Sequence, residues 1–200
     1  PKGKTVLAVP ICNGSLAVFQ HIDLDGNFST GETAISGAIQ GRIFRGSPEF
    51  NQLVRVNDSN IAFKDEDPVD FKGEDYLMQP NVRDALLRLS DLVIAEWGGD
   101  LRVRVTEAYD SMGEHTANSL HYEGRGIDLT LRNTTSGLQQ ANAYGRLTML
   151  AHCAGFDWSW FEDASHSHAS MRGFHGNDNA FRTEIRTNST LPANQRLYML

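Results

Sequence analysis

Hydrophobic residues recur at helical spacing in two stretches of the chain. In residues 75–97 leucines and valines repeat every three or four positions and Gly98 follows directly, which predicts an amphipathic helix with a glycine end. Residues 138–154 show the same spacing and predict a second helix, with Tyr144 and Leu147 on its buried face. The chain therefore contains two main helices.

Alternation of apolar and polar positions predicts strands between and after these helices. Residues 101–106 and 126–131 alternate with period two, as half-buried strands do. Residues 156–162 and 166–171 are two more strand candidates, and the three residues between them suit a tight hairpin. This order of elements predicts an α+β fold in which a mixed sheet packs with two main helices.

Both ends of the chain differ from this central region. Residues 1–40 are rich in turns and contain two short strand candidates, whereas residues 173–200 are polar and rich in asparagine. Residues 23–27 place oxygen side chains at alternate positions, but Ala34 stands where an EF-hand loop needs glutamate, which favours an ordinary turn. We expect an N-terminal β-rich extension (1–40), a central domain (41–172) and a C-terminal extension (173–200).

Charge and hydropathy narrow the class of partner. The 200 residues include 25 acidic and 18 basic side chains, for a formal charge of −7, so a nucleic-acid partner is not expected. No apolar run approaches the ~20 residues that span a bilayer, so membrane insertion is not expected either.

Sequons for N-glycosylation point to the secretory route. Chance predicts about 1.7 Asn-X-Ser/Thr sequons for this composition, whereas the chain has five. The excess predicts a secreted or extracellular glycoprotein, and a polar surface that happens to contain sequons is the alternative. The sequons are at Asn13, Asn27, Asn57, Asn133 and Asn188.

The two cysteines, Cys12 and Cys153, form either one disulfide or two buried thiols.

Histidine placement carries the strongest chemical signal. His166 and His168 project from one face of a strand, and Glu162 lies across the predicted hairpin from His166. A Gly-Arg-Gly turn between His121 and Asp128 can bring that imidazole and that carboxylate into one coordination shell. Three such ligands with one open position are typical of catalytic zinc, whereas a half-buried polar strand face is the alternative.

Acidic residues on both sides of the first helix offer a second constellation. Calcium takes about six to eight oxygen ligands, so converging carboxylates would suit it. A solvated charged face is the other interpretation. The acidic residues are Asp65, Glu66, Asp67, Glu74, Asp75, Glu107 and Asp110.

Three motifs resemble the amino-terminal signalling domain of hedgehog proteins. The resemblance covers roughly residues 40–172, and its second motif is also similar to that of zinc D-Ala-D-Ala peptidases, to which the hedgehog fold is related. It implies a hedgehog/DD-peptidase-like fold. The motifs are LRVRVTEAYD (101–110), SLHYEGRGID (119–128) and AGFDW (154–158).

The resemblance implies a zinc site with a peptidase-like surround. Carried over by position, the zinc ligands fall on His121, Asp128 and His168. The peptidase-like catalytic positions, which hedgehogs retain as a pseudo-active site, fall on His115, Glu162 and His166.

It also implies a calcium site. One acidic position of the family is Met112 here, so we expect one calcium ion rather than two. The calcium-binding positions fall on Glu66, Asp67, Asp75, Glu107 and Asp110.

Two functions follow from the resemblance. The first is an extracellular zinc- and calcium-binding module that engages a receptor or matrix protein through a pseudo-peptidase domain. The alternative is a zinc-dependent peptidase in which Glu162 acts as general base and His166 or His115 stabilises the oxyanion. The chain does not begin with the family's lipid-modified cysteine and no autoprocessing domain lies in the 200 residues, so we expect a hedgehog-like module rather than a conventional hedgehog ligand.

Overall fold

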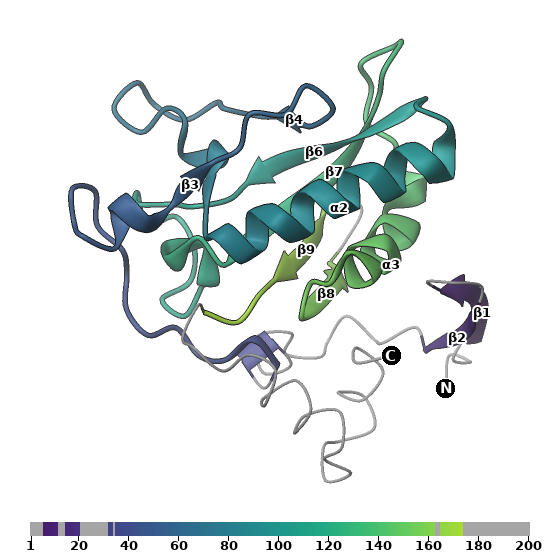
Figure 1. Cartoon of the computed structure of the whole chain (residues 1–200), viewed down its shortest axis with the longest axis horizontal. Helices are drawn as coiled ribbons and strands as arrows, with labels where there is room; N and C mark the ends of the chain where they lie inside the picture. Colours follow the sequence, from purple (N-terminus) through teal and green to yellow (C-terminus); the bar gives the residue numbers. More distant parts are fainter. Residues whose placement is uncertain (1–5, 12–14, 21–31, 34, 163–164, 174–200) are drawn as a thin grey trace, which may run out of the picture.

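A five-stranded mixed sheet forms the centre of the molecule (Figure 1). The computed structural model describes residues 6–11, 15–20, 32–33, 35–162 and 165–173. The strands of the sheet are β4 (Ala62–Phe63), β6 (Leu101–Glu107), β7 (Gly126–Asn133), β8 (Trp158–Phe161) and β9 (Ser167–Ser170). Their order is β4-β6-β7-β9-β8; β4 and β6 are parallel and the other neighbours are antiparallel. The predicted mixed sheet and its β8–β9 hairpin are therefore confirmed.

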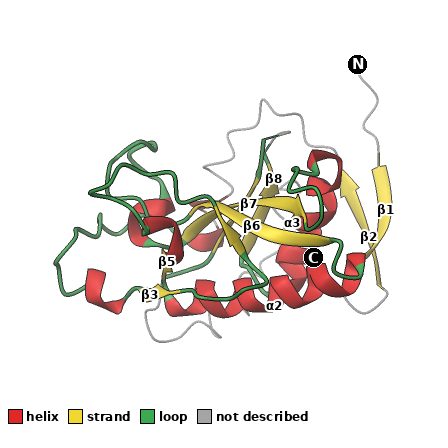
Figure 2. Ribbon diagram, turned by 90° about the horizontal axis from the view of Figure 1, so that it is seen from above, coloured by secondary structure: helices red, strands yellow, loops and turns green. Residues whose placement is uncertain are grey.

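Two helices cover one face of this sheet, as Figure 2 shows. They are α2 (Pro80–Trp97) and α3 (Tyr144–Ala154). α2 begins with proline at its first turn and ends before Gly98, so the predicted glycine end is confirmed. The two-helix α+β fold class follows.

The second helix begins later than its hydrophobic spacing predicts. Residues 138–140 are not helical, because Gln139 forms a bridge with Arg132 and the Gln140 N–H donates to the Leu131 carbonyl at 3.0 Å. The backbone there pairs with the end of β7. A short 3₁₀ turn then leads into α3, so the expected start at residue 138 is wrong by about one and a half turns.

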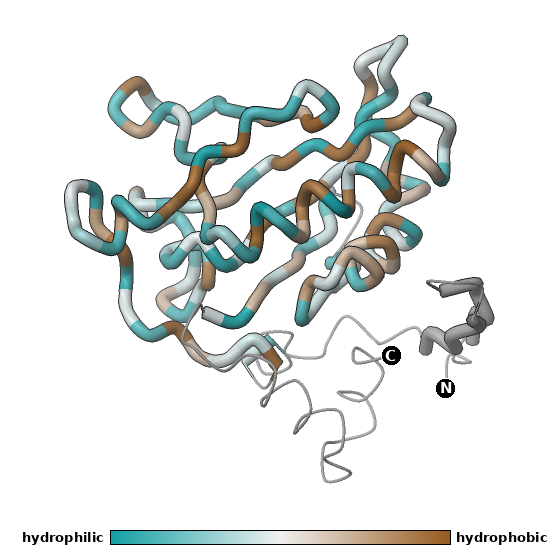
Figure 3. The backbone as a smooth tube through the Cα atoms, in the orientation of Figure 1, coloured by the Kyte–Doolittle hydropathy of each residue, from teal (hydrophilic) through white to brown (hydrophobic). Residues whose placement is uncertain are grey.

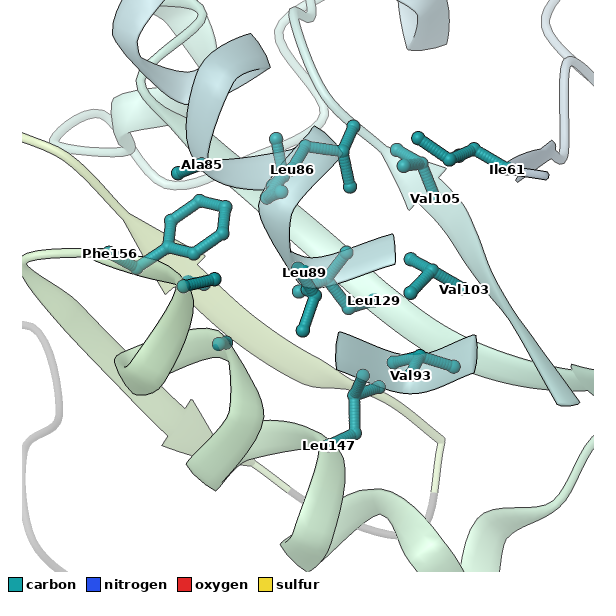
Figure 4. Close-up of a cluster of buried hydrophobic side chains, with 14 of the residues drawn as sticks. Ile61, Ala85, Leu86, Leu89, Val93, Val103, Val105, Leu129, Leu147 and Phe156 are labelled. Carbon is teal, nitrogen blue, oxygen red and sulfur yellow. The ribbon is translucent and has the colours of Figure 1, made fainter. Parts of the chain in front are cut away.

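The core lies between the helices and the sheet (Figure 4). Apolar positions recur along α2 and α3 in Figure 3, and their side chains meet the inward side chains of β6 and β7. Burial of this continuous layer is the main force that holds the sheet under the helices. Figure 4 labels Leu86, Leu89 and Val93 of α2, Val103 and Val105 of β6, Leu129 of β7, Leu147 of α3, and Phe156.

Smaller elements complete the described chain. β1 (Val6–Ile11) and β2 (Ser15–Gln20) pair as an antiparallel hairpin, and β3 (Val54–Arg55) pairs with β5 (Leu77–Met78). The 3₁₀ turns are η2 (Phe50–Gln52), η3 (Glu74–Tyr76), η4 (Leu120–Glu123) and η5 (Ala141–Ala143).

Some sequence predictions fall outside the described residues. These are the turn at residues 23–27 and the C-terminal extension beyond Gly173. Cys153 is disulfide-bonded; the only other cysteine in the sequence, Cys12, also lies outside the described residues.

Candidate metal centre

The turn before β7 positions the first two candidate ligands. The Ser119 hydroxyl accepts the backbone N–H of His121 at 3.3 Å, and Gly124 ends the turn with a left-handed φ of 62°. A Cβ added at Gly126 would lie 3.2 Å from both the His121 backbone nitrogen and His168 Cε1. Glycine at that position therefore lets both histidines close on the start of β7.

His121, Asp128 and His168 form a compact cluster on β7, β9 and η4. One ligand atom from each lies within 4.8 Å of the other two. His168 Nδ1 is 2.7 Å from Asp128 Oδ1, and His121 Nε2 is 3.4 Å from the same oxygen. His121 Nδ1 donates to the Ala108 carbonyl at 2.7 Å, which leaves the Nε2 lone pair directed into the cluster.

Two carboxylates bracket His168. Its Nδ1 donates to Asp128 and its Nε2 donates to Glu32 Oε1 at 2.7 Å. Burial alone would lower the pKa of His168, but the charges of Glu32 and Asp128 hold that pKa well above its ordinary value. Burial alone would raise the pKa of Asp128, but His121 and His168 hold it well below its usual range. The buried charges therefore compensate one another without a metal.

These donors fit zinc. Two imidazoles and one carboxylate are a common three-ligand set for zinc with an open fourth position. Each imidazole also has its second nitrogen held by an oxygen acceptor, Ala108 for His121 and Glu32 for His168, which fixes ring orientation and tautomer. Zinc binding would release the proton from His168 Nδ1 and leave the Nε2–H on Glu32.

Glu32 is a residue that sequence reasoning missed. It lies 136 residues from His168 and outside every motif quoted above. A single acidic residue in a turn-rich segment carries no local signal, so only the folded structure connects it to the cluster.

The predicted peptidase-like residues surround this cluster on two sides. The His115 ring stacks on His121 with centroids 4.2 Å apart. Burial lowers the pKa of His115 to about 4, with His121 as the next cause. On the other side His166 Nε2 is 2.9 Å from Glu162 Oε2 and 3.6 Å from Asp128 Oδ2. His115 and His166 thus contact candidate zinc ligands, and Glu162 is joined to them through His166.

A β-bulge places the acidic residue Glu107 next to the His121/Asp128/His168 cluster. The register of β6 and β7 shifts between Val105 and Glu107, which places Glu107 opposite Asp128. Burial, followed by the charges of Asp75 and Asp67, raises the pKa of Glu107 to about 9. The two candidate sites therefore share one end of the sheet.

Asp75 is buried beside Glu107 with an incomplete set of hydrogen bonds. Its Oδ2 accepts the Asp65 N–H at 2.9 Å, but its Oδ1 has no hydrogen-bond partner among the described residues. Burial, followed by Asp67, raises the pKa of Asp75 to about 6. The pKa of Asp67 is also raised, first by burial and then by Glu74. A buried carboxylate oxygen without a donor is costly, and a cation would relieve that cost.

The other predicted calcium residues differ in how they are held. The Asp110 carboxylate accepts the backbone N–H groups of residues 112–114 at 2.6–3.2 Å, so it also holds that loop. Glu66 is exposed and pairs with Lys64. Glu114, which sequence reasoning did not single out, is close enough to raise the pKa of Asp67.

The fold and this His/Asp/His cluster define an α+β domain with a candidate zinc centre, and comparison with known proteins gives its family. The family profile described as "Hedgehog amino-terminal signalling domain" matches residues 15–170. The chain is 39% identical over 140 residues to Indian hedgehog protein of Gallus gallus, covering 70% of this chain and 32% of that protein. It is 39% identical over 137 residues to Sonic hedgehog protein of Danio rerio (68% and 31%) and 38% identical over 146 residues to Protein hedgehog of Drosophila hydei (73% and 28%).

The chain belongs to the hedgehog family. It spans about a third of the length of these curated relatives. The match begins at residue 15, ahead of the boundary expected at residue 41, and that division of the chain stays a prediction. No helix in the described part of the chain is long and apolar enough to cross a membrane.

Proposed function

We propose that this chain is an extracellular hedgehog-type binding module that holds zinc and calcium and engages a receptor or matrix protein. The observation that carries the proposal is the assembly of His121, Asp128 and His168 within 4.8 Å in a member of the hedgehog family. The five sequons support an extracellular location and a glycoprotein.

Zinc has a stabilising role in this proposal. Zinc would join η4, β7 and β9, which are separated in the sequence, and a ligand that binds only the folded state stabilises it. The ligands are held by Ala108 and Glu32 before any ion arrives, which limits the cost of binding.

Calcium shapes the partner surface in this proposal. Glu107 and Asp75 have raised pKa values because they are buried and because other acids gather around them. Calcium would neutralise these acids, let them ionise together and fix the loops that carry them. The bound ion thereby makes this end of the molecule a defined surface for a protein partner.

The experiment is calcium-dependent capture. Fluorescently labelled chain, zinc-loaded, is applied to intact cells and to deposited extracellular matrix with calcium or with a chelator. Binding should require calcium, and the double charge reversal Glu107→Lys with Asp110→Lys should abolish that dependence. The matched control Asp91→Lys, at an exposed position of α2, should bind like the parent chain. Equal binding with calcium and chelator would contradict the proposal.

A zinc-dependent peptidase is the second candidate. The position of Glu162 favours it: the carboxylate pairs with His166 at 2.9 Å, and His166 reaches Asp128, so both face the candidate zinc ligands. Bound zinc would supply Lewis-acid activation of water. Glu162 would then accept a proton, and His166 or His115 would donate to the oxyanion.

Peptide cleavage separates the two functions. A peptidase should cleave members of a peptide library when zinc-loaded, and Glu162→Ala should abolish turnover while zinc content stays at one ion per chain. If the zinc-loaded parent chain cleaves nothing, the peptidase function is wrong and the binding function stands.

A further inference from the structure

Two of the predicted glycosylation sequons lie near the end of the sheet where β6 begins and β7 ends. Leu101, the first residue of β6, faces Asn133, the last residue of β7. The Arg102 guanidinium donates to the Ser59 carbonyl at 3.0 Å, and Ser59 is the third residue of the Asn57 sequon. Two sequons that lie far apart in the sequence therefore flank the same corner of the molecule.

The local structure presents both asparagine amides. Asn133 Oδ1 accepts the backbone N–H groups of Thr135 and Ser136 at 3.0 and 2.7 Å, which fixes the amide plane and directs its oxygen into the turn. Asn133 Nδ2 makes no hydrogen bond within the described chain. Asn57 is exposed, and the turn after it is ordered by the Asp58 carboxylate, which accepts the Asn60 N–H at 2.7 Å.

An arginine pair lies between the two sequons. Arg102 and Arg132 are exposed and directly opposite each other in the β6–β7 ladder. They border a hollow of about 320 Å³ that Asn133 also lines. Neither guanidinium forms an ion pair with a carboxylate of the described chain; they donate instead to the carbonyls of Ser59 and Gly137. Like charges in facing positions repel and attract anions non-specifically.

We propose that Asn57 and Asn133 carry N-linked oligosaccharides, and that these two glycans shield the arginine pair while the opposite end of the sheet stays open to a partner. Asn133 and Asp128 are five residues apart on β7, a separation of about 17 Å along a strand. Asn133 therefore lies at the opposite end of β7 from Asp128, and the Asn57 sequon lies near that end because Ser59 contacts Arg102. This inference rests on the proposed extracellular function, because only the secretory route supplies the sugar donor.

The modification is a simple transfer. Asparagine Nδ2 forms a bond to C1 of the oligosaccharide and loses one proton, while the bond from C1 to the pyrophosphate of a lipid-linked oligosaccharide donor breaks. The donor thus leaves as the lipid pyrophosphate. The amide nitrogen must be accessible: Asn57 is exposed, and Asn133 is half-buried with no hydrogen bond to its Nδ2 within the described chain.

Site-resolved mass spectrometry tests the two glycans. The chain is secreted from animal cells and treated with the amidase that converts each glycosylated asparagine to aspartate. Conversion should be found at both Asn57 and Asn133. Ser59→Ala and Thr135→Ala should each abolish conversion at one site, whereas Ser59→Thr and Thr135→Ser, which keep the sequons, should not. An unconverted asparagine at either site in the secreted parent chain overturns the proposal.

Arginine reactivity tests the shielding. The folded chain, with and without its glycans, is treated with an arginine-selective dicarbonyl reagent, and each arginine is followed by mass. Removing the glycans should accelerate modification of Arg102 and Arg132 roughly twofold or more, whereas Arg83 in the first turn of α2 should not change. If removing the glycans leaves the modification rates of Arg102 and Arg132 as unchanged as that of Arg83, the proposed shielding is wrong. Neither measurement uses metal or partner binding, so failure here is distinguishable from failure of the proposed binding function.

Discussion

The two candidate metal sites lie side by side at one end of the sheet but differ in how their charges are balanced. In the His121/Asp128/His168 cluster, buried charges of opposite sign face each other, and the pKa of Asp128 is lowered while that of His168 is raised. In the acidic region, burial together with the like charges gathered there raises the pKa values of Glu107 and Asp75 to about 9 and about 6. The first site is organised without an ion, whereas the second is not.

The two ions would therefore stabilise the protein in different ways. Zinc would replace a proton in a geometry that already exists, so its removal should leave the local arrangement largely intact. Calcium would supply positive charge that the acidic region lacks. Without calcium, the stability of the chain should therefore depend on pH through the protonation of these acids. The bulge that sets Glu107 opposite Asp128 places the two sites in contact.

The largest expected effect comes from removing a zinc ligand. His168→Ala should reduce zinc content from one ion per chain to near zero, because two remaining ligands hold zinc poorly. The melting temperature in the presence of zinc should fall accordingly. Elemental analysis of the gel-filtered protein measures this. His152→Ala, on α3, is the control and should retain zinc.

The second effect comes from Glu32, which holds the zinc ligand His168 but is not itself a ligand. Glu32→Gln should lower zinc affinity by about 10- to 100-fold, the range typical for such supporting residues. Competition with a chromophoric zinc chelator measures the affinity. Glu49→Gln, at an exposed position, should not change it. Unaltered affinity in Glu32→Gln would mean that the 2.7 Å contact with His168 does not organise the site.

A smaller effect is expected from a single methyl group. Gly126→Ala would place Cβ 3.2 Å from His168 Cε1, so the ring must shift by a few tenths of an ångström. Zinc affinity should fall about tenfold, in the lower part of the range seen for supporting residues, while the fold persists. Gly145→Ala on α3 has no atom within 4 Å of the new Cβ and serves as the control. Equal affinities in the two variants would contradict the close packing of His168 on β7.

The smallest effect is a pH dependence of stability. The pKa of Glu107 rises from 4.5 to about 9 on folding, so above pH 4.5 the unfolded chain has released a proton that the native state retains. Stability of the metal-free chain should therefore fall as pH rises through this window. His115, whose pKa is lowered from 6.5 to about 4, acts in the opposite direction only below about pH 6.5.

Thermal denaturation between about pH 6.5 and 9 in a chelator, with the parent chain compared to Glu107→Gln, separates the contribution of Glu107 from that of His168, whose pKa is also raised. The melting temperature of the parent chain should drop by a few degrees, and that of Glu107→Gln should drop less. Calcium should flatten the curve of the parent chain. If the melting temperatures of the two proteins fall in parallel with pH, Glu107 is not the source of the pH dependence.

Much of the fold could be predicted from the sequence because its signals are local. The leucine spacing and Gly98 define α2, and the alternation of apolar residues defines β6 and β7. The start of α3 could not be predicted, because pairing of Gln139 and Gln140 with β7 overrides helical spacing.

The candidate site divides in the same way. The approach of His121 to Asp128 follows from a short turn, and the approach of His166 to Glu162 follows from a hairpin. Glu32 could not be found, because its contact joins residues 136 positions apart. The β-bulge at Glu107 could not be predicted either, since strand register depends on the partner strand.

Anomalous X-ray diffraction at the zinc absorption edge tests the central claim most directly. Crystals of the folded chain, purified with zinc and without chelator, should show one strong peak about 2.0–2.2 Å from His121 Nε2, His168 Nδ1 and an Asp128 carboxylate oxygen. If density maps show these three side chains well ordered and no anomalous peak lies between them, the chain is not a zinc-binding hedgehog module.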